Sequence, residues 1–191
     1  MRLRNLLPAL ALVAVPAFAQ NAHFGLQGGL SLPQSDAKDL VDSKTGITVG
    51  LNVAIDLKGG HVLRPRLDFT KTKGSQSGSL YGYTGSADIE ITTTMIGMDY
   101  NYYVSGKATD GFYLIAGLGY ASTKLAATLT VPGYGSGSGD SSAGGMALAF
   151  GVGYQFTPLV GGDIRYTTTE PSIEGEKIKN DTVNVGITFT F

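Results

Sequence analysis

The sequence predicts an all-β fold, an eight-stranded antiparallel up-and-down transmembrane β-barrel, and three observations support this prediction. The last residues, Val183 to Phe191, alternate strictly between an apolar face and a small or polar face, which is the period of a β-strand. Seven other segments alternate in the same way, and the N-terminus has the pattern of an export signal. A barrel strand with one apolar face is expected to turn that face to lipid and to pair with the first strand at closure.

The N-terminal residues 1–19 are predicted to be a cleaved signal peptide. Two arginines precede a mostly apolar run from Leu6 to Phe18, and an A-x-A-type cleavage site ends at Ala19, which are the features of a secretory signal. The run is shorter than the roughly 20 apolar residues of a membrane helix. The alternative interpretation is a buried N-terminal helix. We expect the mature protein to be one exported barrel domain over 20–191.

Composition excludes several other classes of protein and site. The chain has 14 Lys and Arg against 15 Asp and Glu, a net charge of −1, with no basic stripe, so we expect no nucleic-acid partner. It has no Cys, which excludes disulfides and thiolate metal sites. The two histidines lie far apart in the sequence, which argues against a histidine-rich metal site. We therefore expect no cofactor.

The number and length of the alternating segments fit a small barrel. Eight is an even number, as antiparallel closure normally requires, and about ten residues per strand cover the apolar band of an outer membrane. The third segment contains Pro65, which cannot donate a hydrogen bond to a neighbouring strand, so we expect a bulge or an irregularity there. The predicted strands lie within 22–32, 45–57, 61–73, 87–104, 111–131, 145–156, 160–170 and 183–191.

The connections between these strands alternate in length, which predicts the orientation of the barrel. Short connections are expected to face the periplasm and long ones the outside. Residues 86–95 and 122–131 also shift the phase of their apolar residues, which suggests a sheet above the outer leaflet, either a solvated extension or an edge for docking. The predicted long loops are Pro33–Lys44, Gly74–Ser86, Pro132–Gly144 and Glu170–Asp181.

A soluble β-sandwich or a lipocalin-like barrel also alternates, but its apolar face points inward. The second face of this chain is rich in Gly, Ala, Thr and Asn with scattered charges. A water-exposed surface normally carries many more Lys and Glu residues. The membrane barrel is therefore the better interpretation.

The C-terminus resembles the outer-membrane assembly signal of small eight-stranded barrels of the OmpX/OmpA type. The matching residues are Asn184, Gly186, Phe189 and Phe191. The resemblance implies a bacterial outer-membrane location, recognition by the barrel assembly machinery, and contact with outer-membrane lipid and lipopolysaccharide. It does not imply one function, because this family includes adhesins, anchors, small pores and lipid-modifying enzymes.

Seven charged residues fall on the inward phase of the predicted strands. An eight-stranded barrel is just wide enough to be filled by side chains, so we expect these charges to pair with one another. The alternatives are a narrow polar pore or a catalytic carboxylate pair. The predicted lumen network is Asp56, Arg64, Arg66, Asp68, Asp99, Asp163 and Arg165.

The leading functional hypothesis is a non-enzymatic outer-membrane barrel with a structural or adhesion-type role, in which the extracellular loops contact an extracellular protein or surface ligand. A narrow pore or transporter for small or hydrophobic solutes is the alternative, and a lipid-acting enzyme is less favoured. Such enzymes in this family use a histidine near the outer leaflet, whereas His23 and His61 are expected near the periplasmic turns. The glycine-rich stretch 133–139 lacks the Lys-Ser/Thr of a phosphate loop, so it predicts a flexible loop.

Overall fold

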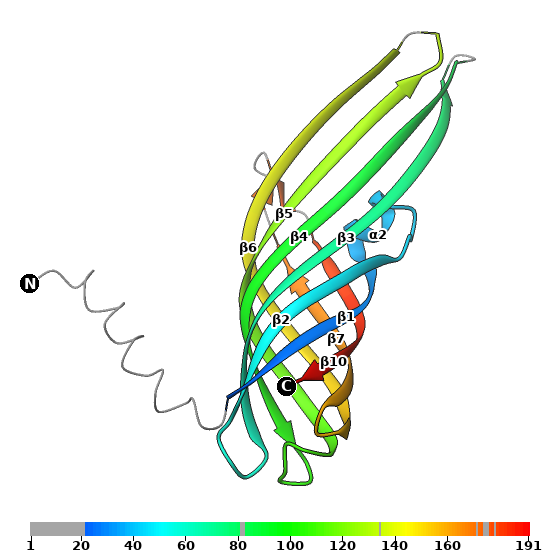
Figure 1. Ribbon diagram of the computed structural model, residues 1–191. Coiled ribbons are helices and arrows are strands. Elements are labelled where there is room, and N and C mark those ends of the chain that lie inside the picture. Colours follow the sequence, from blue (N-terminus) through cyan, green and yellow to red (C-terminus); the bar gives the residue numbers. More distant parts are fainter. Residues whose placement is uncertain (1–21, 81–82, 134, 171, 174–175, 178) are drawn as a thin grey trace, which may run out of the picture.

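The protein is a closed antiparallel barrel, seen from the side in Figure 1. The computed structural model describes residues 22–80, 83–133, 135–170, 172–173, 176–177 and 179–191. The strands follow one another around the barrel in the order β1-β10-β7-β6-β5-β4-β3-β2, and every neighbouring pair is antiparallel. This confirms the predicted fold class. The predicted signal peptide, residues 1–19, lies outside the described residues.

The barrel strands differ greatly in length. Four of them have 10 to 13 residues, whereas β3 to β6 have 20 to 23. No helix within the described ranges is long and apolar enough to span a bilayer. The elements are β1 (Ala22–Gln34), α2 (Ser35–Leu40), β2 (Gly46–Asp56), β3 (His61–Leu80), β4 (Tyr83–Tyr103), β5 (Gly111–Val131), β6 (Gly135–Thr157), β7 (Val160–Thr169), β8 (Ser172–Ile173), β9 (Glu176–Lys177) and β10 (Asp181–Thr190).

The first and last strands close the barrel, as the sequence predicts. β1 pairs with β10 without a register shift from Gly25 opposite Thr190 to Gln34 opposite Asp181. Beyond the strand, the backbone N–H of Phe191 donates to the carbonyl of Phe24 over 2.7 Å. Closure leaves no unpaired edge at this seam.

The outer wall of the closed part is apolar. Large side chains that would be buried in a water-soluble protein are exposed here, among them Phe24 (71%), Phe150 (57%) and Ile164 (52%). Their neighbours in sequence point inward and are small or polar. This arrangement confirms the predicted alternation, and it suits a wall that faces hydrocarbon rather than water.

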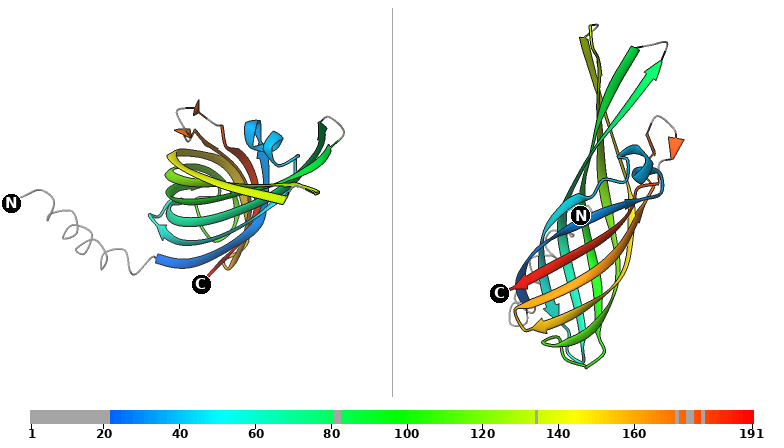
Figure 2. Two further views of the ribbon diagram at one scale, coloured as in Figure 1. Left: turned by 90° about the horizontal axis from the view of Figure 1, so that it is seen from above. Right: turned by 90° about the vertical axis from the view of Figure 1, so that its right-hand side faces the viewer.

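Strands β3 to β6 continue well past the closed barrel and form a four-stranded sheet (Figures 1 and 2). Pairing of β2 with β3 ends at Ile47 opposite Lys71, and pairing of β7 with β6 ends at Thr169 opposite Ala147. The sequence predicted a sheet above the barrel from parts of two strands, whereas four strands contribute to it. Because the sequence predicts that this end faces the outside, we name residues 71–80, 83–94, 122–131 and 135–146 the extracellular sheet.

Two predicted long loops are wrong as a consequence. Most of Gly74–Ser86 belongs to β3 and β4, and residues 135–144, which include 135–139 of the predicted flexible stretch, belong to β6. Gly and Ser have low strand propensity, so composition favoured loops. Pairing overrides that preference, because β5 and β6 stay in register from Val131 opposite Gly135 down to the barrel. The predicted loop Pro33–Lys44 contains the helix α2.

Apolar residues change sides where the barrel ends. In the closed part they point outward, whereas Ile89, Ile91 and Leu125 in the extracellular sheet cluster with residues of the α2 segment. Ala37 and Val41 are 2% and 0% exposed in this cluster. The change in phase is the one predicted for residues 86–95 and 122–131. It fits a wall that meets lipid below the rim and water above it.

Pro65 interrupts the ladder between β2 and β3. The pairs on either side, Asn52 with Arg66 and Ile55 with Leu63, share one register, and no pair is formed between them. On the other side, Pro65 pairs with Met98 in an unbroken register. The expected irregularity is therefore present as a gap in the ladder, and the expected bulge is not formed, because the missing N–H removes a hydrogen bond without adding a residue.

Candidate functional site

The barrel lumen contains a compact group of charged side chains that come from strands far apart in the sequence. Six of the seven predicted lumen residues are buried, with exposures of 2% to 8%. They are Arg64, Arg66, Asp68, Asp99, Asp163 and Arg165. Their inward direction follows from the two-residue period of β3, β4 and β7.

Arg66 is the centre of this group. Its Nε and Nη2 donate to the two oxygens of Asp68 over 2.6 and 2.7 Å, which is a bidentate pair. Its Nη1 donates to Asp99 over 2.9 Å, and Nη2 also donates to Gln27 over 2.8 Å. The planar guanidinium can reach all three partners at once because its donors point outward in a fixed fork.

Arg165 contacts the same two carboxylates from the opposite side of the lumen. It forms an ion pair with Asp99, and its Nη1 lies 3.7 Å from Asp68. Two guanidiniums therefore share two carboxylates, and this group carries no net charge. Such mutual compensation is what makes charge tolerable in a buried site.

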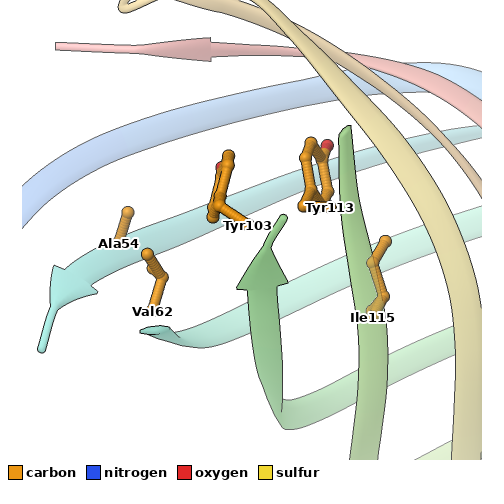
Figure 3. Packing of buried hydrophobic residues seen from close by; sticks show 5 residues of the cluster. All are labelled: Ala54, Val62, Tyr103, Tyr113 and Ile115. Atoms are coloured by element: carbon orange, nitrogen blue, oxygen red, sulfur yellow. The ribbon is translucent and has the colours of Figure 1, made fainter. Parts of the chain in front are cut away.

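Arg64 belongs to a second layer nearer the short turns. Its Nη2 donates to the hydroxyl of Tyr103 over 3.4 Å, and its guanidinium carbon lies 5.9 Å from the centre of the Tyr113 ring. Figure 3 shows Tyr103 and Tyr113 close together beside Ala54 and Val62, and the two ring centres are 4.8 Å apart. Two aromatic rings and one arginine thus pack together in the lumen at this level.

The remaining two predicted residues differ in position. Asp163 accepts a hydrogen bond of 3.3 Å from Gln27, whose carbonyl oxygen in turn accepts from Arg66. Asp56 lies at the end of β2, half-buried, where its carboxylate accepts from the backbone N–H of Lys58 over 2.7 Å. The structure therefore links five of the residues through ion pairs and Gln27, places Arg64 in the second layer, and places Asp56 at the end of β2 beside the turn.

Glycines on the inward phase make room for the large lumen side chains. A Cβ on Gly50 would collide with the carboxylate of Asp68, and a Cβ on Gly117 would collide with that of Asp99. A Cβ on Gly153 would collide with the ring of Tyr113. The many inward glycines are therefore complementary to the network, since an eight-stranded barrel has little internal space.

Two cavities lie on either side of the filled layers. The cavity on the extracellular side has a volume of about 40 Å³ and is bordered by Arg66, Asp68 and Arg165 together with several threonines. The cavity at the short-turn end has about 140 Å³ and is bordered by His23, Asp56 and other residues. The smaller cavity has room for only a few water molecules.

Two residues just before β10 contact segments that are distant in the sequence. The side-chain amide of Asn180 donates to the hydroxyls of Thr93 and Thr123 over 3.3 and 3.2 Å, which links this residue to β4 and β5. The backbone N–H of Lys179 donates to Asp36 at the start of α2 over 3.0 Å. The segment before β10 and the start of α2 therefore meet.

The two histidines lie at the short-turn end, as the sequence predicts. His23 lies in β1 opposite Ala54, and His61 begins β3, where its Nδ1 lies 2.5 Å from the hydroxyl of Tyr100. Across the described ranges, no group of three or more His, Cys, Asp or Glu residues is arranged to hold a metal ion. Both histidines therefore lie at the end of the barrel opposite the extracellular sheet.

The outward face of the extracellular sheet carries ion pairs just above the apolar wall. Glu90 accepts from Lys71 over 2.7 Å and from Lys73 over 3.3 Å, and Lys124 contacts Asp140 over 2.8 Å. The hydrogen bond from Lys71 is the main reason that the pKa of the Glu90 carboxyl lies below its usual value. Pairing with Asp140 raises the pKa of Lys124.

The residues of the predicted assembly signal lie on β10 and just after it. Gly186 and Asn184 stand opposite Gly29 and Ser31 of β1. The side-chain amide of Asn184 donates to Thr182 over 3.2 Å. Phe189 and Phe191 face outward, with exposures of 49% and 67%. The two aromatic residues thus form an exposed stripe at the closing seam.

Reasoning from the sequence did not assign roles to Gln27, Tyr103, Tyr113 and Asn180. The first three lie on the inward phase, so the alternation of β1, β4 and β5 contained a usable signal. By residue type alone, the two tyrosines would be assigned to an aromatic belt at the membrane interface and not to the lumen. No local pattern marks Asn180, because its partners on β4 and β5 are distant in sequence.

A family model described as the outer membrane protein beta-barrel domain matches residues 6–191. The fold is similar to that of Ail, the attachment invasion locus protein of Yersinia pestis in complex with the heparin analogue sucrose octasulfate (TM-score 0.58, 15% identity, 89% of this chain and 97% of that chain). It is also similar to Neisserial surface protein A (TM-score 0.54, 15% identity, 90% and 97%). A third similar structure is the N-terminal β-barrel domain of Pseudomonas aeruginosa OprF (TM-score 0.53, 12% identity, 90% and 98%).

No curated protein matches the chain, and the identities to the solved structures are low enough that these likenesses show the fold alone. The family match extends over nearly the whole chain. It agrees with the closed ring of strands and with the apolar outer wall. The chain belongs to the outer membrane protein β-barrel family, and it is an integral β-barrel of the bacterial outer membrane.

Proposed function

We propose that this protein is a non-enzymatic surface barrel with a sealed lumen, and that its function is to contact an extracellular partner through the extracellular sheet. The observation that carries the proposal is the length of β3 to β6. These strands have 20 to 23 residues, about twice the 9 to 11 residues that a membrane strand needs. The additional length serves no purpose in crossing the membrane.

The packing of the lumen supports a sealed barrel over a pore. A conducting path would have to pass the paired charges of Arg66, Asp68, Asp99 and Arg165, and then the ring layer of Tyr103 and Tyr113. The cavity that borders the charges on the side of the long strands has a volume of about 40 Å³. The narrow pore remains the alternative, and it requires these layers to move.

Conductance of single molecules in planar bilayers tests the sealed lumen. We expect the refolded wild-type protein to show no steady conductance, and we expect Arg66→Ala and Asp99→Ala to produce openings or weaker folding, since each leaves a buried charge without its partner. Steady conductance of the wild type that changes with these substitutions would contradict the seal and establish a small pore.

Contact with a partner is tested by shortening the extracellular sheet. A variant in which both hairpins end near Thr92 and Lys124 keeps the closed barrel and all lumen contacts. Cells that display the wild type are expected to adhere to immobilised heparin more strongly than cells that display the shortened barrel at equal surface level. Heparin is the probe because the similar Ail structure contains a heparin analogue. Equal adhesion of both barrels to heparin would refute the proposal.

We propose the same cellular route that the sequence predicts. Cleavage after Ala19 would leave a mature domain from residue 20, and Asn184, Gly186, Phe189 and Phe191 would form the signal that the barrel assembly machinery recognises. The exposed aromatic pair at the closing seam supports this assignment. N-terminal sequencing of the purified outer-membrane protein tests the cleavage site, and a mature start elsewhere would refute it.

A further inference from the structure

The lumen cavity at the short-turn end is lined by charged and apolar side chains together. It has a volume of about 140 Å³, and Asp56 and Arg64 are among its lining residues. Ala54, Val62 and Tyr103 also line it, and Figure 3 shows these three side chains close together. The volume is several times the roughly 30 Å³ that one water molecule occupies in the liquid, so a small solute fits this cavity.

Arg64 reaches this cavity as a buried cation that forms no ion pair with any described residue. Its exposure is 5%, and the ion pairs of the lumen join Arg66 and Arg165 to their carboxylates instead. Within the described ranges, the Nε of Arg64 is buried without a hydrogen-bond partner, and its Nη2 forms only the long bond of 3.4 Å to Tyr103. A buried charge without a counter-charge is costly, and most of the five guanidinium donors remain free for an acceptor.

The guanidinium of Arg64 is held in place by the layer of rings beside it. The hydroxyl of Tyr103 accepts from Arg64 and donates to the side-chain oxygen of Gln155 over 3.3 Å. The side-chain nitrogen of Gln155 donates in turn to the backbone carbonyl of Thr157 over 2.7 Å. The Tyr113 ring covers another side of the guanidinium. A cation positioned in this way binds a ligand without first having to be ordered.

Asp56 supplies a negative charge on the same wall of the cavity. It stands opposite Val62, two residues before Arg64 on β3, so the two charged residues are diagonal neighbours on the inward face, where the spacing is about 7–8 Å. One oxygen of the Asp56 carboxylate accepts from the backbone N–H of Lys58 over 2.7 Å, and the other oxygen is left for a further donor. The cavity thus has a cation and an anion side by side that a small molecule can bridge.

We propose that this cavity binds a small zwitterion, an α-amino acid of the size of glycine or alanine, with its carboxylate on Arg64 and its ammonium group on Asp56. The two opposite charges in one cavity carry the proposal, because a simple anion would meet the Asp56 carboxylate and a simple cation would meet the guanidinium of Arg64. The apolar lining of Ala54 and Val62 suits a hydrogen or methyl side chain. The site lies at the end predicted to face the periplasm, and it does not depend on contact between the extracellular sheet and a partner.

Titration of the isotope-labelled barrel in detergent micelles with glycine tests the site, and the NMR signal of the Arg64 Nε–H group is the readout. We expect a saturable shift of this signal, because the ligand carboxylate accepts from the guanidinium. Acetate and methylammonium each carry only one of the two charges, and a hydrogen bond between charged groups contributes enough that each should bind about tenfold more weakly or less. Phenylalanine should cause no saturable shift, since a cavity of about 140 Å³ has no room for its ring.

Two matched variants separate this site from the general charge of the short-turn end. Asp56→Asn keeps an oxygen acceptor for the N–H of Lys58 but removes the negative charge, so it should weaken glycine binding about tenfold and leave acetate binding equal or tighter. Asp110→Asn removes an exposed carboxylate at the same end that does not line the cavity, and glycine binding should stay within twofold of wild type. The proposal is overturned if glycine causes no saturable shift, if acetate, methylammonium or phenylalanine binds the wild type as tightly as glycine, or if the two variants bind glycine equally. The comparison of ligands uses the wild type alone, so it decides the question even where a variant does not fold.

Discussion

Removal of the Arg66 side chain tests whether the lumen network stabilises the barrel. Arg66 donates two hydrogen bonds to Asp68, one to Asp99 and one to Gln27. In Arg66→Ala the nearest cation to Asp68 is Arg165, with 3.7 Å between the ion-pair atoms. Because a buried carboxylate loses its bidentate partner, we expect the free energy of unfolding to fall by about 3–5 kcal/mol.

The measurement is urea unfolding of the barrel in lipid vesicles, under conditions where folding and unfolding curves coincide. Lys124→Ala is the matched control, because it breaks an ion pair whose side chains are 56% and 60% exposed, and it should leave the unfolding curve unchanged. A loss below about 1 kcal/mol for Arg66→Ala would place the network in the range of solvated ion pairs and refute the reasoning.

A second substitution separates the loss of contacts from the cost of stranded charge. In Arg66→Ala with Asp68→Ala, the carboxylate that lost its partner is absent as well. Part of the lost stability should therefore return, and the coupling between the two positions should be about 0.5–3 kcal/mol. Additive losses would show that Asp68 is solvated when Arg66 is removed, which the small cavity beside it does not favour.

Three further predictions follow from the same structure. Gly117→Val places atoms where the carboxylate of Asp99 lies, so it should lower the free energy of unfolding in vesicles by about 1–3 kcal/mol. Gly137→Val is the control, because a Cβ there meets nothing within 4 Å, and it should cause no measurable loss. Equal losses would contradict the packing argument. The hydrogen bond from Lys71 lowers the pKa of the Glu90 carboxyl below 4.5. The contribution of this carboxylate to folding stability is therefore present above pH 4.5 and is lost as the pH falls through the lower pKa of the folded state. Carboxyl NMR titration should show that the pKa rises toward 4.5 in Lys71→Ala, and an unchanged pKa would disprove the pairing. Phe191→Ala should lower the amount of barrel assembled in cells but not the yield of folding into vesicles without the assembly machinery, and an equal loss in both would argue for a purely structural role.

The inward direction of the charged residues could be predicted from the sequence because a strand has a strict two-residue period. Arg64, Arg66 and Asp68 follow one another on alternate positions of β3, so one correct strand places three network members. The same period also turns Asp56, the last residue of β2, toward the lumen cavity at the short-turn end, but it does not decide the partner of this carboxylate. There the backbone N–H of Lys58 is a nearer partner than any lumen arginine, so the turn decides its contacts.

The contacts within the lumen could not be predicted, because they depend on how the barrel closes. Arg66 on β3 and Arg165 on β7 meet at Asp99 of β4 only when the ring of eight strands is complete. Tyrosine is a residue type that is common in the aromatic belts of membrane proteins, yet Tyr103 and Tyr113 are buried because their positions in the strands point them inward. Phase therefore outweighs residue type in a barrel, because the wall leaves each side chain only two directions.

The length of the extracellular sheet was the main failure of prediction, and its cause is physical. The sequence from Gly135 to Gly145 consists mostly of Gly and Ser, residues that do not favour strands on their own. They form a strand because β5 provides a long partner whose register the barrel below has already set. The low strand preference of these residues is thus compensated by pairing with β5, which extends outward from the part of the barrel where the register is already set.

An extended sheet with two open edges would normally be a site of aggregation, and the two edges of this one are protected differently. The β3 edge carries Lys71 and Lys73 on its outward face, and the α2 segment lies against it, where the side-chain amide of Gln76 donates to the carbonyl of Asp39 over 2.8 Å. The β6 edge is formed by small, flexible residues that pair weakly with a foreign strand. A partner that approaches the sheet therefore meets a less obstructed path at the β6 edge and at the inner apolar face that α2 leaves uncovered, where Leu129 is 55% exposed. Binding through that face should respond to substitution of Leu129, whereas binding through the strand edge should respond to a proline placed in β6, since only the edge uses backbone hydrogen bonds.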